Sequence, residues 1–255
     1  MRSFPAPRAI FALLLREVAT IYGRTPGGYL WAFLEPVAAV AMLAAVFALA
    51  FDTPPLGRDF PLFYASGYLP FAYYSDMAQK VGVAIRFSRP LMAYPAVTWL
   101  DAILARFLLN SLTHITVIAV VFATMIRVSG ADSPNIFPIL GALALAGTLG
   151  LGIGSLNAFC FERWPVWERL WTIVNRPTFL ISGVLFLPDA LPPPYREWIW
   201  LNPLAHVVTQ TRVGLYPGYQ SDEVSSAYVL GWAAISFLFG LLFLRRYARE
   251  ILGRI

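Results

Sequence analysis

The sequence predicts an all-helical membrane protein with six transmembrane spans and both termini in the cytoplasm. Of its 255 residues, 58% are apolar and 13% are charged, whereas charged residues make up about 25% of an ordinary soluble domain. Apolar stretches of about 20 residues, the length that a bilayer-spanning helix needs, recur along the chain. The basic residues lie mostly between these stretches, as expected for a polytopic membrane protein.

The six expected spans follow one another along the whole chain. We place them at about residues 29–51, 60–83, 99–126, 136–161, 170–187 and 227–244. Pro61, Pro70 and Pro177 interrupt the second and fifth spans, which membrane helices tolerate when neighbouring groups satisfy the freed carbonyl. We therefore expect one transmembrane domain over 1–255, with an interface helix at about 6–22, the six-span region at 29–244 and a cytoplasmic tail at 245–255.

The positions of Lys and Arg give the orientation. With the N-terminus inside, 13 basic residues fall in cytoplasmic segments and 4 in outer segments, a clear positive-inside bias. The net charge of +5 therefore indicates membrane orientation and not nucleic-acid binding. The cytoplasmic set is Arg2, Arg8, Arg16, Arg24, Lys80, Arg86, Arg89, Arg163, Arg169, Arg245, Arg246, Arg249 and Arg254; the outer set is Arg58, Arg127, Arg196 and Arg212.

Two segments outside the spans also carry a pattern. Residues 6–22 are apolar on most of their surface, with Arg16, Glu17 and Thr20 close together on one helical face. This pattern is typical of an amphipathic helix in the cytoplasmic interface; an ordinary basic flank is the alternative. The connection from Asp189 to Asp222 is long, rich in proline and still apolar. Its Trp198 and Trp200 suit the membrane interface, so we expect part of it to re-enter the outer leaflet.

No catalytic or metal-binding constellation stands out. His114 and His206 belong to no metal-ligand spacing, and a lone His114 on an apolar helix is best explained as a structural residue. Phosphate-binding Walker loops and serine nucleophile elbows are also missing from the sequence. Four glycines in the fourth span favour close helix packing: Gly147, Gly150, Gly152 and Gly154. We expect no cofactor on this chain and ATP hydrolysis on another polypeptide.

Several motifs then occur in a recognisable order. They are Leu14-Leu15-Arg16-Glu17, Tyr22-Gly23-Arg24, Gly28-Tyr29-Leu30-Trp31, Leu34-Glu35-Pro36, Ser88-Arg89-Pro90-Leu91, Arg176-Pro177, Ile181-Ser182-Gly183-Val184, Leu191-Pro192 and Asn202-Pro203-Leu204-Ala205-His206. Over nearly the whole chain this series resembles the permeases of polysaccharide-exporting ABC transporters. The resemblance is nearest to the capsule exporters of the KpsM type, with O-antigen permeases of the Wzm type more distant.

The resemblance implies partners and a location. It implies a homodimer in the bacterial inner membrane, two copies of a separate ATPase that uses ATP and Mg, and a lipid-linked capsular polysaccharide as cargo. It further implies a periplasmic adaptor and an outer-membrane export protein. An O-antigen or other cell-surface glycan is the alternative cargo. In one respect the sequence departs from the family, because the stretch from Asp189 to Pro194 is unusually rich in proline.

Two other classes of function stay open at this point. One is a membrane enzyme acting on lipid-linked sugars, which would need the outer acids; the other is a non-catalytic scaffold. The outer acids lack an accompanying His or metal pattern and are better explained as solvated loop charges: Asp189, Glu197, Asp222 and Glu223.

The cytoplasmic connection from Ser88 to Thr98 is a candidate docking segment for the ATPase. Pro90 and Pro95 bracket a short apolar run, and one helical turn of this kind can insert into a cleft on a moving partner. The residues we assign to this coupling are Arg89, Pro90, Leu91 and Tyr94. A plain connecting loop is the alternative.

Aromatic residues in the second span are candidates for the substrate path. Aromatic rings pack on the C–H faces of sugars, and tyrosine hydroxyls exchange hydrogen bonds with sugar hydroxyls. The assigned residues are Tyr64, Tyr68, Phe71, Tyr73 and Tyr74, with Trp198 and Trp200 on the outer side. Because residues three or four apart share a helix face, Tyr64, Tyr68 and Phe71 should act together. For Phe60, Phe63 and Tyr64 a lipid-facing aromatic belt is nearly as good an explanation.

Three charges inside the predicted spans are candidates for the cytoplasmic entrance, together with Arg24. Glu35, Arg106 and Arg176 lie at comparable depth in spans one, three and five. Since an isolated charge at bilayer depth is costly, we expect Glu35 to pair with Arg106 or Arg176. The remaining arginine would then be available to an anionic lipid head group or sugar; a purely structural ion pair is the alternative.

Overall fold

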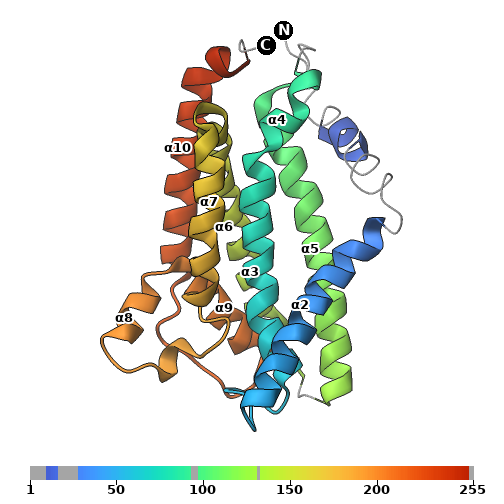
Figure 1. Ribbon diagram of the computed structural model, residues 1–255, viewed down its shortest axis with the longest axis vertical. Coiled ribbons are helices and arrows are strands. Elements are labelled where there is room, and N and C mark those ends of the chain that lie inside the picture. Colours follow the sequence, from blue (N-terminus) through green and yellow to red (C-terminus); the bar gives the residue numbers. More distant parts are fainter. Residues whose placement is uncertain (1–9, 17–27, 93–96, 131–132, 253–255) are drawn as a thin grey trace.

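The computed structural model describes residues 10–16, 28–92, 97–130 and 133–252, and these are helical with no strand among them (Figure 1). Residues 10–16 form a short helix. The other helices are α2 (Gly28–Ala50), α3 (Phe60–Gly82), α4 (Ala84–Ser88), α5 (Trp99–Ser129), α6 (Ile136–Arg163), α7 (Pro165–Leu180), α8 (Tyr195–Trp200), α9 (Pro203–Leu215) and α10 (Ser226–Leu252), with 3₁₀ turns at Arg89–Leu91 and Pro188–Ala190. The predicted all-helical class is confirmed.

Four of the described helices are long and apolar enough to cross a bilayer. They cover Leu30–Ala50, Trp99–Ser129, Ile136–Arg163 and Ser226–Tyr247, which matches the predicted spans one, three, four and six. The predicted spans two and five correspond to α3 and α7. α3 is long enough at 23 residues but carries Asp76 and Lys80, and α7 has only 16 residues. The six-span arrangement therefore stays a prediction.

α6 is the central helix of the bundle and packs against α3, α5, α7, α9 and α10. Small residues allow this close approach: a Cβ on Gly150 would lie 2.7 Å from the Cβ of Met77 in α3, and a Cβ on Gly152 would lie 2.3 Å from the carbonyl oxygen of Ala233 in α10. Gly147 and Gly154 are equally crowded by α3. The predicted packing role of these four glycines is confirmed.

Helix ends in the bundle have local causes in the sequence. Thr98 and Asp101 form a capping box at the start of α5, which satisfies two of the free backbone donors there. Pro165 ends α6 at Arg163, because a proline restricts the residue before it to extended geometry. Trp164 is accordingly extended, and it is the single residue between α6 and α7.

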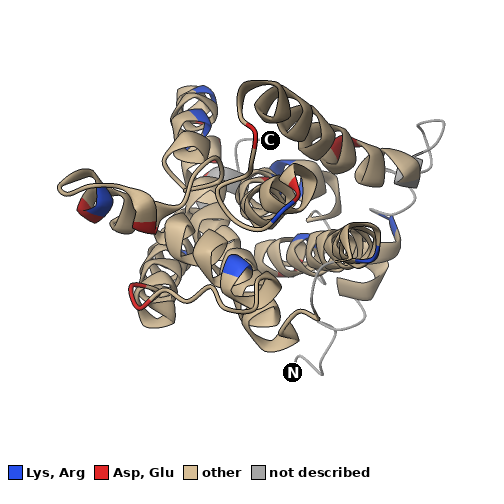
Figure 2. Cartoon of the chain, turned by 90° about the horizontal axis from the view of Figure 1, so that it is seen from below, with Lys and Arg blue, Asp and Glu red and all other residues tan. Residues whose placement is uncertain are grey.

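α7 and α2 are the most exposed of the long helices. α7 has no buried residue, and only 11% of the apolar window of α2 is buried. Figure 1 shows α2 crossing α3 and α5 obliquely, while α7 runs alongside α6. Figure 2 shows the helices from below, where most of the ribbon is uncharged and the acidic and basic residues fall in small separate groups.

The segment between α7 and α10 has two helical parts with different environments. α8 extends away from the bundle (Figure 1), whereas α9 packs against α3, α6 and α10. Trp198 in α8 is 63% exposed, but Trp200 is only 9% exposed, with its ring centroid 4.9 Å from that of His206. The predicted re-entry of this segment into the outer leaflet stays a prediction.

Candidate functional site

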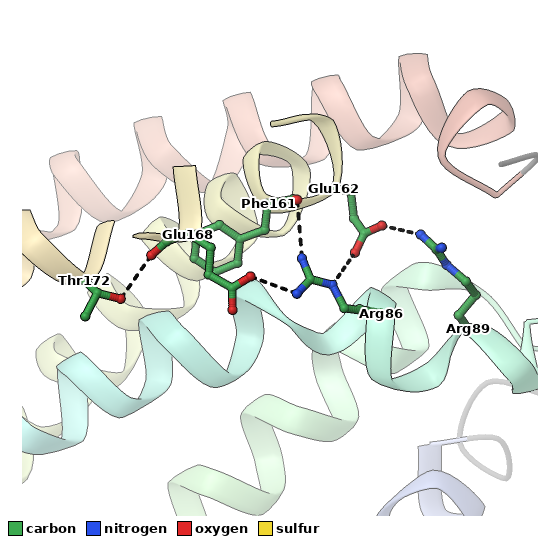
Figure 3. Close-up of polar contacts among 6 residues, drawn as sticks. All are labelled: Arg86, Arg89, Phe161, Glu162, Glu168 and Thr172. Atoms are coloured by element: carbon green, nitrogen blue, oxygen red, sulfur yellow. Dashed lines mark hydrogen bonds and ion pairs between the residues drawn. The ribbon is translucent and has the colours of Figure 1, made fainter. Parts of the chain in front are cut away.

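A network of charged side chains joins three helices at the end of the bundle where α4 lies (Figures 1 and 3). Arg86 of α4 donates from Nε to Glu162 Oε1 at 3.3 Å and from Nη1 to Glu168 Oε2 at 2.8 Å. Its Nη2 also donates to the carbonyl oxygen of Phe161 at 3.4 Å. Arg89 pairs with the second oxygen of Glu162. One guanidinium thus holds acids from α6 and α7 together.

Burial differs within this network. The side chain of Glu162 is only 6% exposed and has two arginine partners, whereas Arg86 is close to half exposed. The hydrogen bond to Glu168, opposed by desolvation, raises the pKa of the Arg86 guanidinium above its ordinary value. The Arg86–Glu168 pair, in which both side chains are partly exposed, contributes about 0.2–1 kcal/mol, so this link can rearrange at little cost.

The network spans the break between α6 and α7. Glu162 lies in the last turn of α6 and Glu168 in the first turn of α7, with Trp164 as the only non-helical residue between the helices. Thr172, one turn further on, donates to the carbonyl of Glu168 at 3.0 Å (Figure 3). A displacement of α4 would therefore act directly on the start of α7.

The predicted coupling segment begins next to this network. Arg89, Pro90 and Leu91 form one 3₁₀ turn directly after α4, in line with the single helical turn expected there. Leu91 is partly exposed and Arg89 pairs with Glu162. Tyr94 and Pro95 lie outside the described residues. The docking role of the segment stays a prediction.

A pocket of about 630 Å³ lies between α3 and α7, about two turns further from this end. Polar groups line it from both helices: Ser75, Asp76 and Gln79 from α3, and Thr172, Asn175 and Arg176 from α7. Aromatic rings form its other walls: Phe71, Trp171 and Phe179. Asn175 Nδ2 donates to Ser75 Oγ at 2.6 Å and so ties the two helices together.

Asp76 is the residue of this region that the sequence reasoning missed. Its carboxylate lies 3.0 Å from Lys80 Nζ and 3.1 Å from His114 Nε2 of α5. The His114 ring stacks on Tyr73 at 5.3 Å between centroids, and Tyr73 donates to Ser111 at 2.8 Å. His114 is thus a satisfied residue between helices, as expected, but its partner is an acid inside a predicted span. The i, i+4 spacing of Asp76 and Lys80 is the signal that could have indicated this cluster.

The predicted aromatic path divides into two groups. Tyr64, Tyr73 and Tyr74 are buried within the subunit. Tyr64 packs against Phe47 of α2. Phe71 and the partly buried Tyr68 instead contact the ring of Phe179 in α7, and Phe71 reaches the pocket. The substrate role of these residues stays a prediction.

No ion pair joins Glu35 to Arg106 or Arg176 among the described residues, and the predicted pair within the membrane stays a prediction. Glu35 is exposed on α2. Arg106 is buried with its guanidinium 4.1 Å from the ring centroid of Phe87, so it faces α4. Arg176 is exposed and lines the pocket between α3 and α7. Arg24 lies outside the described residues.

Arg212 is a second residue whose role the sequence does not indicate, because its position predicts an outer loop. It lies in α9 and is 0% exposed. Its guanidinium donates to the carbonyls of Val184 and Phe186 at 2.9 Å each and to Ser66 Oγ at 3.3 Å. It also lies 4.3 Å from the ring centroid of Phe63. Arg212 therefore fastens the segment after α7 to α3.

Two of the four outer acids, Asp189 and Glu223, have hydrogen-bond or ion-pair partners. Asp189 accepts from Tyr219 at 2.7 Å and from Ser221 at 3.2 Å. Arg196 lies 3.1 Å from Glu223 and 3.6 Å from Asp189. Within the described parts of the chain, no group of three His, Cys, Asp or Glu side chains could hold a metal ion.

Sequence comparisons relate the chain to known proteins. Residues 8–216 match the family described as ABC-2 type transporter. The chain is 30% identical over 236 residues to the polysialic acid transport protein KpsM of Escherichia coli, covering 92% of this chain and 91% of the relative. It is 26% identical to the capsule polysaccharide export inner-membrane protein CtrC of Neisseria meningitidis serogroup B, over 96% and 92% of the two chains. It is 24% identical to the capsule polysaccharide export inner-membrane protein BexB of Haemophilus influenzae, over 96% and 92%.

Proposed function

The chain belongs to the ABC-2 type transporter family, and from that premise we propose that it is the permease subunit of a capsular polysaccharide exporter in the bacterial inner membrane. The observation that carries this proposal is its similarity, over more than nine-tenths of the chain, to relatives named for polysialic acid transport and for capsule polysaccharide export. These relatives are transport subunits, and an enzyme activity is not part of the proposal.

The proposed assembly includes partners that supply the energy and complete the export route. Two copies of this subunit, each with six spans and cytoplasmic termini, would combine with two copies of a separate ATPase that uses ATP and Mg. The broad apolar surfaces of α2 and α7 are suited to contact lipid or a second subunit. A lipid-linked polysaccharide, a periplasmic adaptor and an outer-membrane export protein complete the proposal.

The charge network around Arg86 supports a route for mechanical coupling. In this proposal the ATPase moves the 3₁₀ turn at Arg89–Leu91 and, with it, α4. Arg86 then acts on Glu162 and Glu168 at the two sides of the α6–α7 break. α7 carries the pocket residues at its other end, so the same helix would connect the ATPase side to the pocket.

Gene deletion and complementation test the proposed function. Cells that lack this gene should lose surface capsule and accumulate the polymer inside, and the wild-type gene should restore export. The measurement is polysaccharide on intact and on permeabilised cells with a polymer-specific reagent. A deletion strain that still exports normal capsule would contradict the proposal.

A single substitution tests the coupling route separately. Leu91→Asp should abolish co-purification of the ATPase and export, because it places a charge on the apolar turn expected to dock. Leu112→Asn, on an exposed face of α5 away from the turn, is the control for expression and insertion. ATPase co-purification at the wild-type level with L91D would contradict docking at this turn.

A further inference from the structure

We infer that the pocket between α3 and α7 binds an anionic, hydroxyl-bearing group of the exported glycan, with Arg176 as its counter-charge. The inference rests on the proposed function for the nature of the cargo. The pocket volume of about 630 Å³ lies in the range of ligand pockets, roughly 300–1,000 Å³. Both walls come from helices of one subunit, so the site is defined without a partner chain.

Two buried polar atoms at the pocket have no hydrogen-bond partner in the described subunit. They are Trp171 Nε1, which can only donate, and Asn175 Oδ1, which can only accept. Leaving such groups unsatisfied costs about 1–3 kcal/mol each. Asn175 Nδ2 donates to Ser75 Oγ at 2.6 Å, and in this arrangement its oxygen has no partner.

A single sugar hydroxyl has the donor and acceptor groups that Trp171 Nε1 and Asn175 Oδ1 lack as partners. Trp171 and Asn175 are four residues apart on α7 and therefore share a helix face. A hydroxyl can accept from the indole N–H and donate to the amide oxygen at the same time. Phe71 and Phe179 add an apolar wall, with ring centroids 5.3 Å apart, against which the C–H face of a sugar ring can pack.

The charges of the pocket favour an anion. The carboxylate of Asp76 also faces the pocket, but Lys80 and His114 hold it at 3.0 and 3.1 Å. Arg176 has no carboxylate within ion-pair distance among the described residues, so its guanidinium is available. The shared chemistry is a carboxylate or phosphate that carries hydroxyl groups, supplied either by an acidic sugar of the polymer or by the head group of its lipid anchor.

Binding to the intact permease–ATPase complex in nanodiscs tests the inference. The probe is short oligosialic acid, with dextran oligosaccharide of the same length as the neutral control, in phosphatidylcholine nanodiscs. Arg176→Gln should weaken oligosialic acid binding about tenfold, the loss of one charge-assisted contact. Trp171→Phe keeps the ring, removes the donor and should weaken binding about threefold. Arg169→Gln, a neighbour on α7 that does not line the pocket, is the matched control and should bind as wild type.

The lipid source is separated by a second arm in which phosphatidylglycerol replaces phosphatidylcholine. Arg176-dependent binding of oligosialic acid assigns the anion to the polymer, whereas Arg176-dependent enrichment of phosphatidylglycerol without oligosialic acid binding assigns it to a lipid head group. Equal behaviour of R176Q and R169Q in both arms would overturn the site. If R176Q fails to assemble, the binding of oligosialic acid to W171F is the test of the site. Wild-type binding by W171F in both arms would overturn the site as well. Loss of export in the deletion strain together with wild-type binding by R176Q would overturn the pocket and leave the proposed function intact.

Discussion

Arg86 and Arg212 lie toward opposite ends of the bundle, and their guanidinium groups differ in exposure and in the kind of partner that they bind. Arg86 is partly exposed and bonds to two carboxylates on different helices. Arg212 is fully buried, and the hydrogen-bond partners found for it are neutral, two carbonyls and a hydroxyl. An exposed ion pair exchanges readily with water, whereas breaking a buried set of hydrogen bonds leaves carbonyls unsatisfied. The comparison indicates that the end of the bundle with Arg86 is suited to rearrangement, whereas the end with Arg212 is suited to keeping a fixed geometry.

Replacing Arg212 should have the largest effect on stability. Arg212→Met removes the donors for Val184, Phe186 and Ser66, so the free energy of unfolding should fall by at least about 3 kcal/mol. The measurement is thermal unfolding and yield of purified protein in detergent. Arg127→Met, an exposed arginine in the last turn of α5, is the control. A stable R212M protein with a wild-type midpoint would remove the distinction between the two ends.

Asn202 offers a second test of the rigid end. Its Oδ1 caps α9 by accepting from the Leu204 N–H, while its Nδ2 donates to Ile181 O and Ser182 Oγ at 3.1 Å each. Asn202→Ala should lower the free energy of unfolding by about 1–2 kcal/mol. Asn135→Ala is the matched control, because Asn135 caps α6 in the same way. A smaller loss for N202A than for N135A would mean that the ties to the end of α7 contribute no stability.

Arg86 should show the reverse pattern, with little effect on stability and a clear effect on transport. Arg86→Ala should lower the free energy of unfolding by less than about 1 kcal/mol, because its pair with Glu168 is partly exposed and the buried Glu162 keeps Arg89 as a partner. Export per molecule should nevertheless fall at least about fivefold if these pairs carry the coupling. Arg86→Lys should recover only part of it, since an ammonium cannot bridge Glu162 and Glu168 in the fork geometry of a guanidinium. Wild-type export by R86A, at the expression level of an Arg169→Ala control, would contradict the coupling role.

Arg196 tests whether burial or location in the bundle decides the contribution of an arginine to stability. Its replacement should have the smallest effect on the free energy of unfolding. It lies in α8, in the same outer region as Arg212, but its pairs with Asp189 and Glu223 are exposed. Arg196→Gln should therefore change the free energy of unfolding by less than about 0.5 kcal/mol. The same thermal unfolding assay checks this value. A loss as large as that of R212M would show that location, and not burial, decides the difference.

The parts of the fold that depend on neighbouring residues could be predicted from the sequence. Length and hydropathy indicate α2, α5, α6 and α10, and the proline at Pro165 explains why α6 ends where it does. The Asn202-Pro203 pair was recognised only as a family motif, although its physical role is a helix cap with proline in the first turn.

The parts that depend on distant residues could not be predicted in the same way. The sequence predicts a loop at Arg212 because α9, at 13 residues, is too short to be recognised as a span. Its partners are mainly carbonyls, which every residue has and no sequence pattern marks. Arg86 and Glu162 are 76 residues apart, so their pairing follows from the packing of α4 on α6. Depth likewise does not identify the partner of Glu35, since equal depth in two helices does not fix which faces meet.

Trp164, the single residue between α6 and α7, can act as a pivot about which α7 tilts as a rigid lever. α7 is 16 residues long, which makes it about 24 Å from pivot to tip at 1.5 Å per residue. A tilt of about 10° around Trp164 would shift Asn175, about 15 Å along, by roughly 2.6 Å, and the tip by roughly 4 Å. The charged first turn, close to the pivot, would move by less than about 1 Å. Such a lever has a gain of about four at the tip and about three at the amide, so a small displacement of Glu168 becomes one comparable to a hydrogen bond at Asn175.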